Sequence, residues 1–174
     1  MTEPAPTATP TPGLASPTAP VAQSSPSPSP DVDMSWLDLT GIDFSGADLK
    51  RSTFHGTLLR NANLSGADLS GADMTGAVLL NANLAGASLT DADLSGAMMV
   101  RADLSGADLT GAVLQGASLR DANLSNVSLD GAGLSGADLS GADLAGVTWS
   151  SVTCPDGENS DDHGGTCEGH LSPG

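Results

Sequence analysis

The sequence is short of the large side chains that fill most protein interiors. Of its 174 residues two are Trp, two are Phe and none is Tyr, so aromatic residues make up 2% of the chain. Ala, Leu and Gly therefore have to fill the interior, which suits a thin core that repeats along an axis. The sequence also has no window near the roughly 18 apolar residues that a membrane-spanning helix needs. These absences argue against an ordinary globular core and against a membrane span.

Basic residues are also scarce. The chain has 5 Lys and Arg against 21 Asp and Glu, which gives a net charge of −16. Residues 37–152 hold 13 acids and all five bases, a net charge of −8, and the two ends carry the rest. Such a surface repels nucleic acid and anionic membranes because their phosphates meet like charge. We therefore expect no nucleic-acid partner, and solubility explains the charge most simply.

One periodicity organises most of the chain. Every fifth residue from Leu39 to Trp149 is large and apolar, and 18 of these 23 positions are Leu. We call these residues rungs. The residue two before each rung is usually Ala, and bulkier residues such as Ile42 and Val147 occur near the ends. A period of five fits neither a strand nor an amphipathic helix, so it indicates a structural repeat.

The residues after each rung predict tight corners. Two positions after the rung, 15 of 23 residues are Gly and five are Asn or Asp. These residue types best tolerate the positive φ that a sharp turn requires. The pattern predicts that the chain turns a corner every five residues, with Leu and Ala side chains inside.

The repeat resembles the A(D/N)LxG unit of the pentapeptide-repeat family. Representative segments begin at Ala67, Ala82 and Ala137, and the match covers about residues 37–152. The resemblance implies an all-β fold, a right-handed quadrilateral β-helix with four repeats per coil. About six coils at a strand spacing of about 4.8 Å would form a rod of roughly 29 Å.

The ends of the chain differ from the repeat. Residues 1–30 contain nine prolines separated mainly by Thr, Ser and Ala, a composition typical of a disordered stalk or of a mere flexible tail. We expect a Pro/Ser/Thr-rich stalk over 1–33, the β-helix over 34–153 and a capping loop over 154–174. Met34 and Trp36 are expected to cover the open first coil, because a solenoid end otherwise exposes its core.

One side of the expected β-helix carries an apolar surface. Residues 20 apart should stack, which brings together Leu58, Val78 and Met98, with Leu80 and Val100 beside them. Arg60, Arg101 and Arg120 fall on or next to this side. An exposed apolar patch with an Arg rim is typical of a protein interface, although apolar residues tolerated on a very stable scaffold would look the same. We predict binding of a protein partner or self-association here.

The C-terminal tail contains both cysteines. Cys154 and Cys167 enclose twelve residues, and a disulfide between them is the simplest interpretation. The tail is similar to CPDG…GGTCxGHL endings that follow some bacterial pentapeptide arrays, which implies a cap over the last coil near Trp149. Two metal-binding alternatives remain. Zinc would use Cys154, His163, Cys167 and His170, and calcium would use Asp156, Glu158, Asn159, Asp161 and Asp162. Neither spacing matches a common site, so no metal or cofactor is predicted.

These observations favour a non-enzymatic scaffold or protein-interaction module. No Ser/His/Asp or Cys/His set is apparent, and His55 stands alone in its coil. The stalk and the disulfide favour a secreted or cell-surface location, with the cytoplasm as the alternative. The family resemblance implies a second function, a cytosolic DNA mimic that binds a type II topoisomerase (gyrase) and protects it from quinolones. Charge density argues against this function, since 29 Å of B-DNA carries about 17 charges and the repeats carry −8.

Overall fold

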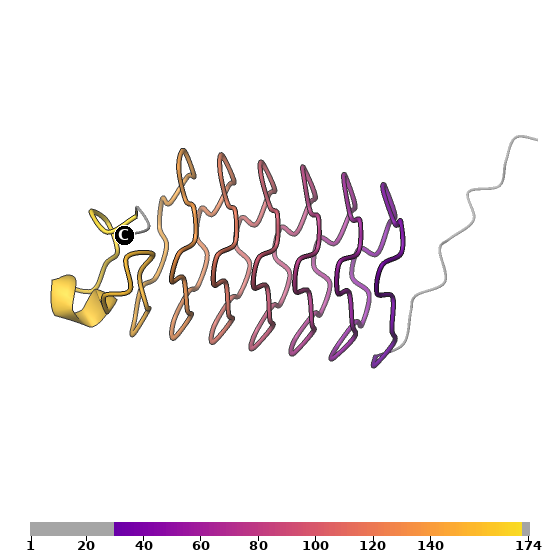
Figure 1. Ribbon diagram of the computed structural model, residues 1–174, viewed down its shortest axis with the longest axis horizontal. Helices are drawn as coiled ribbons and strands as arrows, with labels where there is room; N and C mark the ends of the chain where they lie inside the picture. The colour runs from indigo at the N-terminus through magenta and orange to yellow at the C-terminus, as the bar shows by residue number, and fades with distance from the viewer. Residues whose placement is uncertain (1–29, 172–174) are drawn as a thin grey trace, which may run out of the picture.

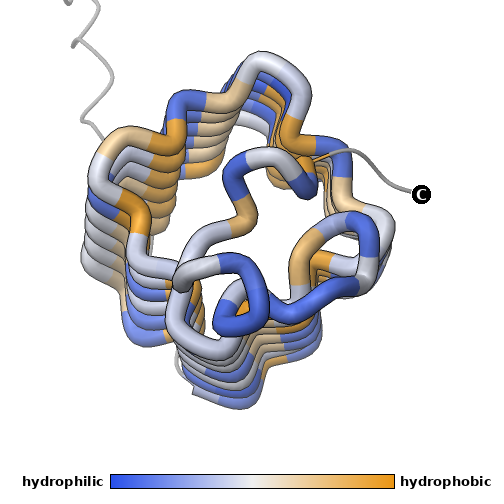
Figure 2. Tube along the Cα trace, turned by 90° about the vertical axis from the view of Figure 1, so that its left-hand side faces the viewer, coloured by the Kyte–Doolittle hydropathy of each residue, from blue (hydrophilic) through white to orange (hydrophobic). Residues whose placement is uncertain are grey.

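Backbone pairing joins residues that are 20 apart in the sequence. Parallel bridges run without a break in register from Asp33–Thr53 to Gly133–Thr153. Four steps of five residues therefore complete one coil, and successive coils stack into an elongated solenoid (Figure 1). Seen end-on, the coils superimpose in a four-sided outline (Figure 2). This is the four-sided arrangement expected from the period of five.

The computed structural model describes residues 30–171. Most of the stalk predicted over 1–33 lies outside the described residues, as do residues 172–174. Residues 31–33, which the prediction assigned to the stalk, pair with the first coil, since the Asp31 N–H donates to the Lys50 carbonyl and Asp33 bridges Thr53.

We name the four sides A to D by the outward residue that precedes each rung. Side A has the outward residues 38, 58, 78, 98, 118 and 138, and side B has 43, 63, 83, 103, 123 and 143. Side C has 48, 68, 88, 108, 128 and 148, and side D has 33, 53, 73, 93, 113, 133 and 153. Along the chain each coil passes through sides A, B, C and D in turn.

The interior consists of the rungs and the small residues before them. Leu94 is 0% exposed and Ala92 is 0% exposed, and the same pattern holds through the central coils. The Leu94 N–H donates to the Val113 carbonyl of the next coil at 2.7 Å, whereas the Asp93 N–H donates to the Ala72 carbonyl of the previous coil at 2.9 Å. Because each side has only one bridged residue between two turns, the sheets form without long strands.

The corners adopt the left-handed backbone conformation that the Gly, Asn and Asp residues predicted. Gly86 has φ +65° and Asn81 has φ +54°. Arg51 and Arg101 occupy the same corner position with φ values of 53° and 57°. The position thus requires positive φ whatever residue stands there, and burial of the flanking rungs maintains it.

The N-terminal end departs from the prediction for Trp36. Met34 is 9% exposed and closes the first coil, and its carbonyl accepts a hydrogen bond from the buried Thr57 hydroxyl at 2.7 Å. Trp36 is 73% exposed, so the prediction that it covers the coil is wrong. It occupies a corner position with φ 62°, which turns its side chain outward, and its ring lies over Gly56.

The C-terminal segment folds back on the last coil. The only helix among residues 30–171 is the short 3-10 helix η1 (Ser160–His163), whose N-terminus is capped by Asn159. The buried Ser160 hydroxyl donates to the Trp149 carbonyl, and Trp149 is 6% exposed. Within the described part of the chain, no helix is long and apolar enough to cross a membrane.

Candidate protein-interaction surface

The outward residue before each rung normally caps the following turn. In 14 repeats this residue is Asp or Asn, and in all 14 its side-chain Oδ1 accepts a hydrogen bond from the backbone N–H two residues later. The donor-to-acceptor distances are 2.9–3.3 Å. Asp and Asn are short enough to make this local bond, which explains their frequency at the position.

The turn bonds lower the pKa of several carboxyl groups. The hydroxyls of Ser35 and Ser140, together with the backbone N–H groups of the same residues, lower the pKa of Asp33 and Asp138. The backbone N–H of Ser45 and then its hydroxyl lower the pKa of Asp43. Each bond favours the ionised carboxylate, because only that form accepts at all of its oxygens.

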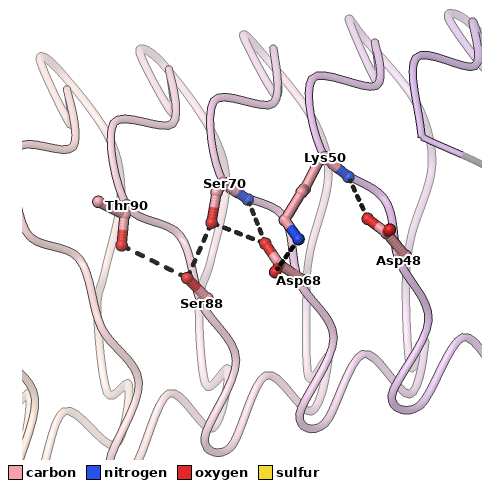
Figure 3. A network of polar contacts seen from close by, with 6 residues as sticks. All are labelled: Asp48, Lys50, Asp68, Ser70, Ser88 and Thr90. Atoms are coloured by element: carbon pink, nitrogen blue, oxygen red, sulfur yellow. Dashed lines mark hydrogen bonds and ion pairs between the residues drawn. The ribbon is translucent and has the colours of Figure 1, made fainter.

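Sides B and C carry such polar residues along their whole length. On side C, the Asp68 carboxylate accepts from the Ser70 N–H and lies 2.9 Å from the Lys50 Nζ, and the Ser70 and Ser88 hydroxyls are 2.9 Å apart (Figure 3). On side B, the Asn63 amide donates to Asp43 at 3.0 Å. Within-chain bonds account for these side chains, so we assign them to turn stability and solvation.

Side A is different because apolar residues replace the capping carboxylates in three consecutive coils. Leu58, Val78 and Met98 pair directly through parallel bridges. Leu80 and Val100 lie one position past the neighbouring rungs and are half-buried. We define the apolar strip as Leu58, Val78, Leu80, Met98 and Val100. The structure thus brings together all five apolar residues that the sequence analysis selected.

Exposure along the apolar strip is uneven. Met98 is 41% exposed, whereas Val78 is only 8% exposed. The expectation that Val78 is an exposed residue is therefore wrong. Val78 precedes its rung like the other outward residues, and it is bridged on both sides by residues with larger side chains, Leu58 and Met98. Met98 is the most accessible apolar side chain of the strip.

The apolar residues cannot make the bond that their position otherwise provides. A Leu, Val or Met side chain has no oxygen to accept the N–H of Arg60, Leu80 or Val100, so each substitution loses a turn cap. Such a local bond stabilises a fold by about 0.5–1.5 kcal/mol. Leu58, Val78 and Met98 thus stand where the fold itself favours Asp or Asn, and stability of the solenoid does not explain them.

The rim of side A also has its own charge pattern. Arg60, Arg101 and Arg120 are all exposed. Arg120 Nε lies 3.8 Å from the Asp138 carboxylate, a weak contact at an exposed site. Side A with its two flanking corners holds three bases and three acids, Asp38, Asp121 and Asp138. The other sides of residues 37–152 hold the remaining ten acids and two bases, so they carry the whole net charge of −8.

The structure adds two residues that the sequence analysis did not include. Trp36 is 73% exposed and Leu37 is 48% exposed, at the corner where side D meets side A. Trp36 contacts His55 edge-to-face, with ring centroids 4.8 Å apart. It lies so close to Gly56 that a Cβ there would come within 2.4 Å of its ring. The signal was present in the sequence, since Trp36 stands two residues after Met34, where later repeats mostly have Gly.

The C-terminal cap contains the disulfide between Cys154 and Cys167, with Cα atoms 5.5 Å apart and both residues 0% exposed. Both thiols of the zinc hypothesis are therefore bound to each other. The residues of the calcium hypothesis make structural bonds, for example from Ser151 to Asp161 and from the Glu158 N–H to Asp156. Within residues 30–171, no group of three or more His, Cys, Asp or Glu side chains is arranged to hold a metal ion.

Comparisons with known proteins identify the class of this solenoid. The sequence profile described as Pentapeptide repeats matches residues 31–66, 67–106 and 107–146, in 8 copies. The chain belongs to the pentapeptide-repeat family, whose members fold as right-handed quadrilateral β-helices. A search of curated proteins found no significant match.

Solved structures of other family members are similar to this chain. QnrB1, a plasmid-mediated fluoroquinolone resistance protein, shares 23% identity over 71% of this chain and 70% of its own, with a TM-score of 0.52. A pentapeptide repeat protein from the Arabidopsis thaliana thylakoid lumen shares 34% identity over 72% of this chain and 86% of its own, with a TM-score of 0.46. HetL from the cyanobacterium Nostoc sp. strain PCC 7120 is involved in heterocyst differentiation regulation. It shares 30% identity over 75% of this chain and 90% of its own, with a TM-score of 0.32.

Proposed function

We propose that this protein is a non-enzymatic scaffold that binds another protein chain through side A. The observation that carries the proposal is the presence of Leu58, Val78 and Met98 at the position where 14 other repeats have a turn-capping Asp or Asn. Apolar residues placed against the local preference of the fold, and rimmed by Arg, are typical of a binding surface. Trp36 and Arg side chains beside the strip are of the types that dominate binding energies at interfaces.

Site-specific photo-crosslinking tests this function. A benzoylphenylalanine is introduced in place of Met98, and in a control protein in place of Val113, and each is irradiated in cells that naturally make the protein. Val113 is a matched control because it occupies the same repeat position on side D and is 42% exposed, against 41% for Met98. We expect a discrete crosslinked protein from position 98 alone. Equal crosslinking from both positions, or none from position 98, would contradict the proposal.

We also propose that the scaffold works in an oxidising compartment, at the cell surface or outside the cell. The buried Cys154–Cys167 disulfide supports this location, because reducing cytosols keep most thiols free. Intact mass of the endogenous protein, with and without alkylation, is measured separately in supernatant, envelope and cytosol. An oxidised form outside the cytosol is expected. A cytosolic form with two free thiols would refute this location and leave the binding surface untouched.

A second candidate function is DNA mimicry toward a type II topoisomerase. The net charge of −8 on sides B, C and D favours it. The likeness to QnrB1 supports only the shared fold, since the identity is 23%. The solenoid carries about half of the roughly 17 charges of an equal length of B-DNA, and side A interrupts the acidic surface. We therefore expect no protection of gyrase supercoiling from a fluoroquinolone, and protection at stoichiometric concentration would establish the second function instead.

A further inference from the structure

We infer that the partner of side A is a second copy of this chain, paired face to face with the two solenoid axes parallel. The inference rests on the proposed function of side A and names its partner. Three features carry it: the charge balance of side A, the order of its residues along the coils and the shape of its two corners.

The charge balance decides where two copies are able to meet. Each chain has a net charge of −16, so contact between most surfaces of two copies is repulsive. Side A with its corners has no net charge, whereas the other three sides of residues 37–152 together carry −8. Side A is therefore the face of the solenoid on which self-association meets the least repulsion.

The order of residues along side A selects the parallel arrangement. A two-fold axis parallel to the solenoid axis places each outward residue opposite the residue two positions later in the same coil of the partner. This pairing sets Val78 opposite Leu80 and Met98 opposite Val100 at the centre. Arg60 then faces Leu58 and lies one coil from Asp38 of the partner. Arg120 lies one coil from Asp138 of the partner, as it does from Asp138 of its own chain. Apolar contacts at the centre with opposite charges at the rim are the usual anatomy of an interface.

The antiparallel arrangement has the opposite electrostatics. A two-fold axis across the solenoid, between the coils of Val78 and Met98, would place Arg60 opposite Arg120 and Asp38 opposite Asp138. Both pairs carry like charges, which is unfavourable at an interface. In this register side A is thus complementary to itself in the parallel orientation and not in the antiparallel one.

The corners of side A fit the same arrangement. The corner before side A consists of glycines after Trp36, and the corner after it carries Asn61, Asn81, Arg101 and Asp121. In the parallel pairing these two corners face each other. Arg101 then lies opposite Gly96, for example, which leaves space for the long side chain. Two copies are able to approach closely because bulky residues on one corner meet glycines on the other.

The experiment measures the dimer of the full-length, oxidised protein. Sedimentation velocity over a concentration series is expected to show a monomer–dimer equilibrium. Arg120→Asp should weaken dimerisation at least tenfold, since it places two carboxylates together, and adding Asp138→Arg should restore it by exchanging the two charges. In the antiparallel register described above, Arg120→Asp alone would instead strengthen the dimer, because Arg120 would face Arg60.

The orientation is measured independently with spin labels on Thr40→Cys and Ser140→Cys, which are exposed and five coils apart, about 24 Å at 4.8 Å per coil. Parallel pairing predicts short distances in dimers labelled at position 40 or at position 140. Short distances only in mixed dimers, labelled at 40 in one copy and 140 in the other, would overturn the parallel arrangement. A protein that stays monomeric would overturn self-pairing, and crosslinking of a different protein from position 98 would then still support side A as a binding surface.

Discussion

The residue before each rung has two competing uses in this protein. As Asp or Asn it accepts a backbone N–H and caps the turn, and as Leu, Val or Met it contributes to an outward apolar strip. Both kinds of residue fit the same backbone, because the side chain points away from the core. At each coil the residue at this position therefore either stabilises the turn or adds apolar surface to the outside of the solenoid.

Val113→Asp tests the stabilising use directly. Val113 is 42% exposed on side D and lies between Asp93 and Gly133 in its column. We expect a gain of about 1 kcal/mol, because Asp supplies an acceptor for the Gln115 N–H. Val113→Asn should give a similar gain without the added charge. Thermal melts followed by circular dichroism measure both, and an unchanged or lower Tm in both variants would show that the turn bond contributes nothing.

The turn bonds also predict how stability depends on pH. Their acceptors Asp33, Asp38, Asp43 and Asp138 have a lower pKa in the folded protein than the unfolded value of 3.8, chiefly because Ser and Thr hydroxyls and backbone N–H groups donate to them. The folded state therefore binds protons less readily than the unfolded state. Their contribution to stability is complete above pH 3.8 and is lost as the pH falls through the folded pKa values.

Urea unfolding between pH 6 and pH 2.5 measures this dependence. We expect the free energy of unfolding to fall as the pH drops below the unfolded pKa of 3.8. Asp43→Asn keeps the oxygen acceptor and removes the titration, so the slope should become shallower. A stability that rises throughout this acid range would mean that relief of the −16 charge outweighs the turn bonds.

At the scale of the coil, stability comes from stacking each rung between its copies above and below. Leu94 is 0% exposed and contributes on the order of 2 kcal/mol by burial. Leu94→Asp places an unpaired charge in mid-stack, and we expect loss of cooperative melting. A soluble variant with the Tm of the parent would refute the inward rung. Ala85→Asp, half-buried on the outer surface of side B, is the control that should melt near the parent.

The cap at the C-terminal end predicts a distinct effect of reduction. Breaking the Cys154–Cys167 bond should destabilise the protein by about 3 kcal/mol and release the segment around η1 from the last coil. Trp149 is 6% exposed and Trp36 is 73% exposed, so half of the Trp residues are already accessible. Reduction should make the second Trp accessible to acrylamide quenching. Trp149→Phe identifies that signal, and quenching that does not change on reduction would refute the cap.

Sequence periodicity predicted the coils, the corners and the inward rungs closely, and the reason is physical. An unbroken period of five fixes the coil, and Gly, Asn or Asp at one phase fixes the corner, so residues 20 apart had to stack. The exposure of single side chains was less predictable. Val78 is shielded because of the size of its neighbours in other coils, and Trp36 turns outward because a corner residue takes positive φ even when it is not Gly. Such facts depend on packing between coils, which a repeat pattern does not encode.

Over the whole molecule, the charged residues are distributed so that three sides of the solenoid are acidic and one side has equal numbers of acids and bases. Sides B, C and D carry the net charge of −8 and keep the protein soluble, whereas side A has the apolar strip and no net charge. The comparisons establish the family and the fold. They leave the partner to be inferred from this surface, because relatives of the same fold differ in what they do.

The outward apolar residues of side A should lower the stability of the fold and provide association. Met98→Asp and Val113→Asp test it most directly, because the two residues share repeat position and exposure and differ in their side. Sedimentation velocity is measured on both variants and the parent. Melting is measured at a concentration at which all three are monomeric, because dimerisation itself raises the Tm. We expect both variants to melt at a higher temperature than the parent and only Met98→Asp to abolish the dimer. Equal sedimentation of the two variants, or a lower melting temperature for both, would contradict it.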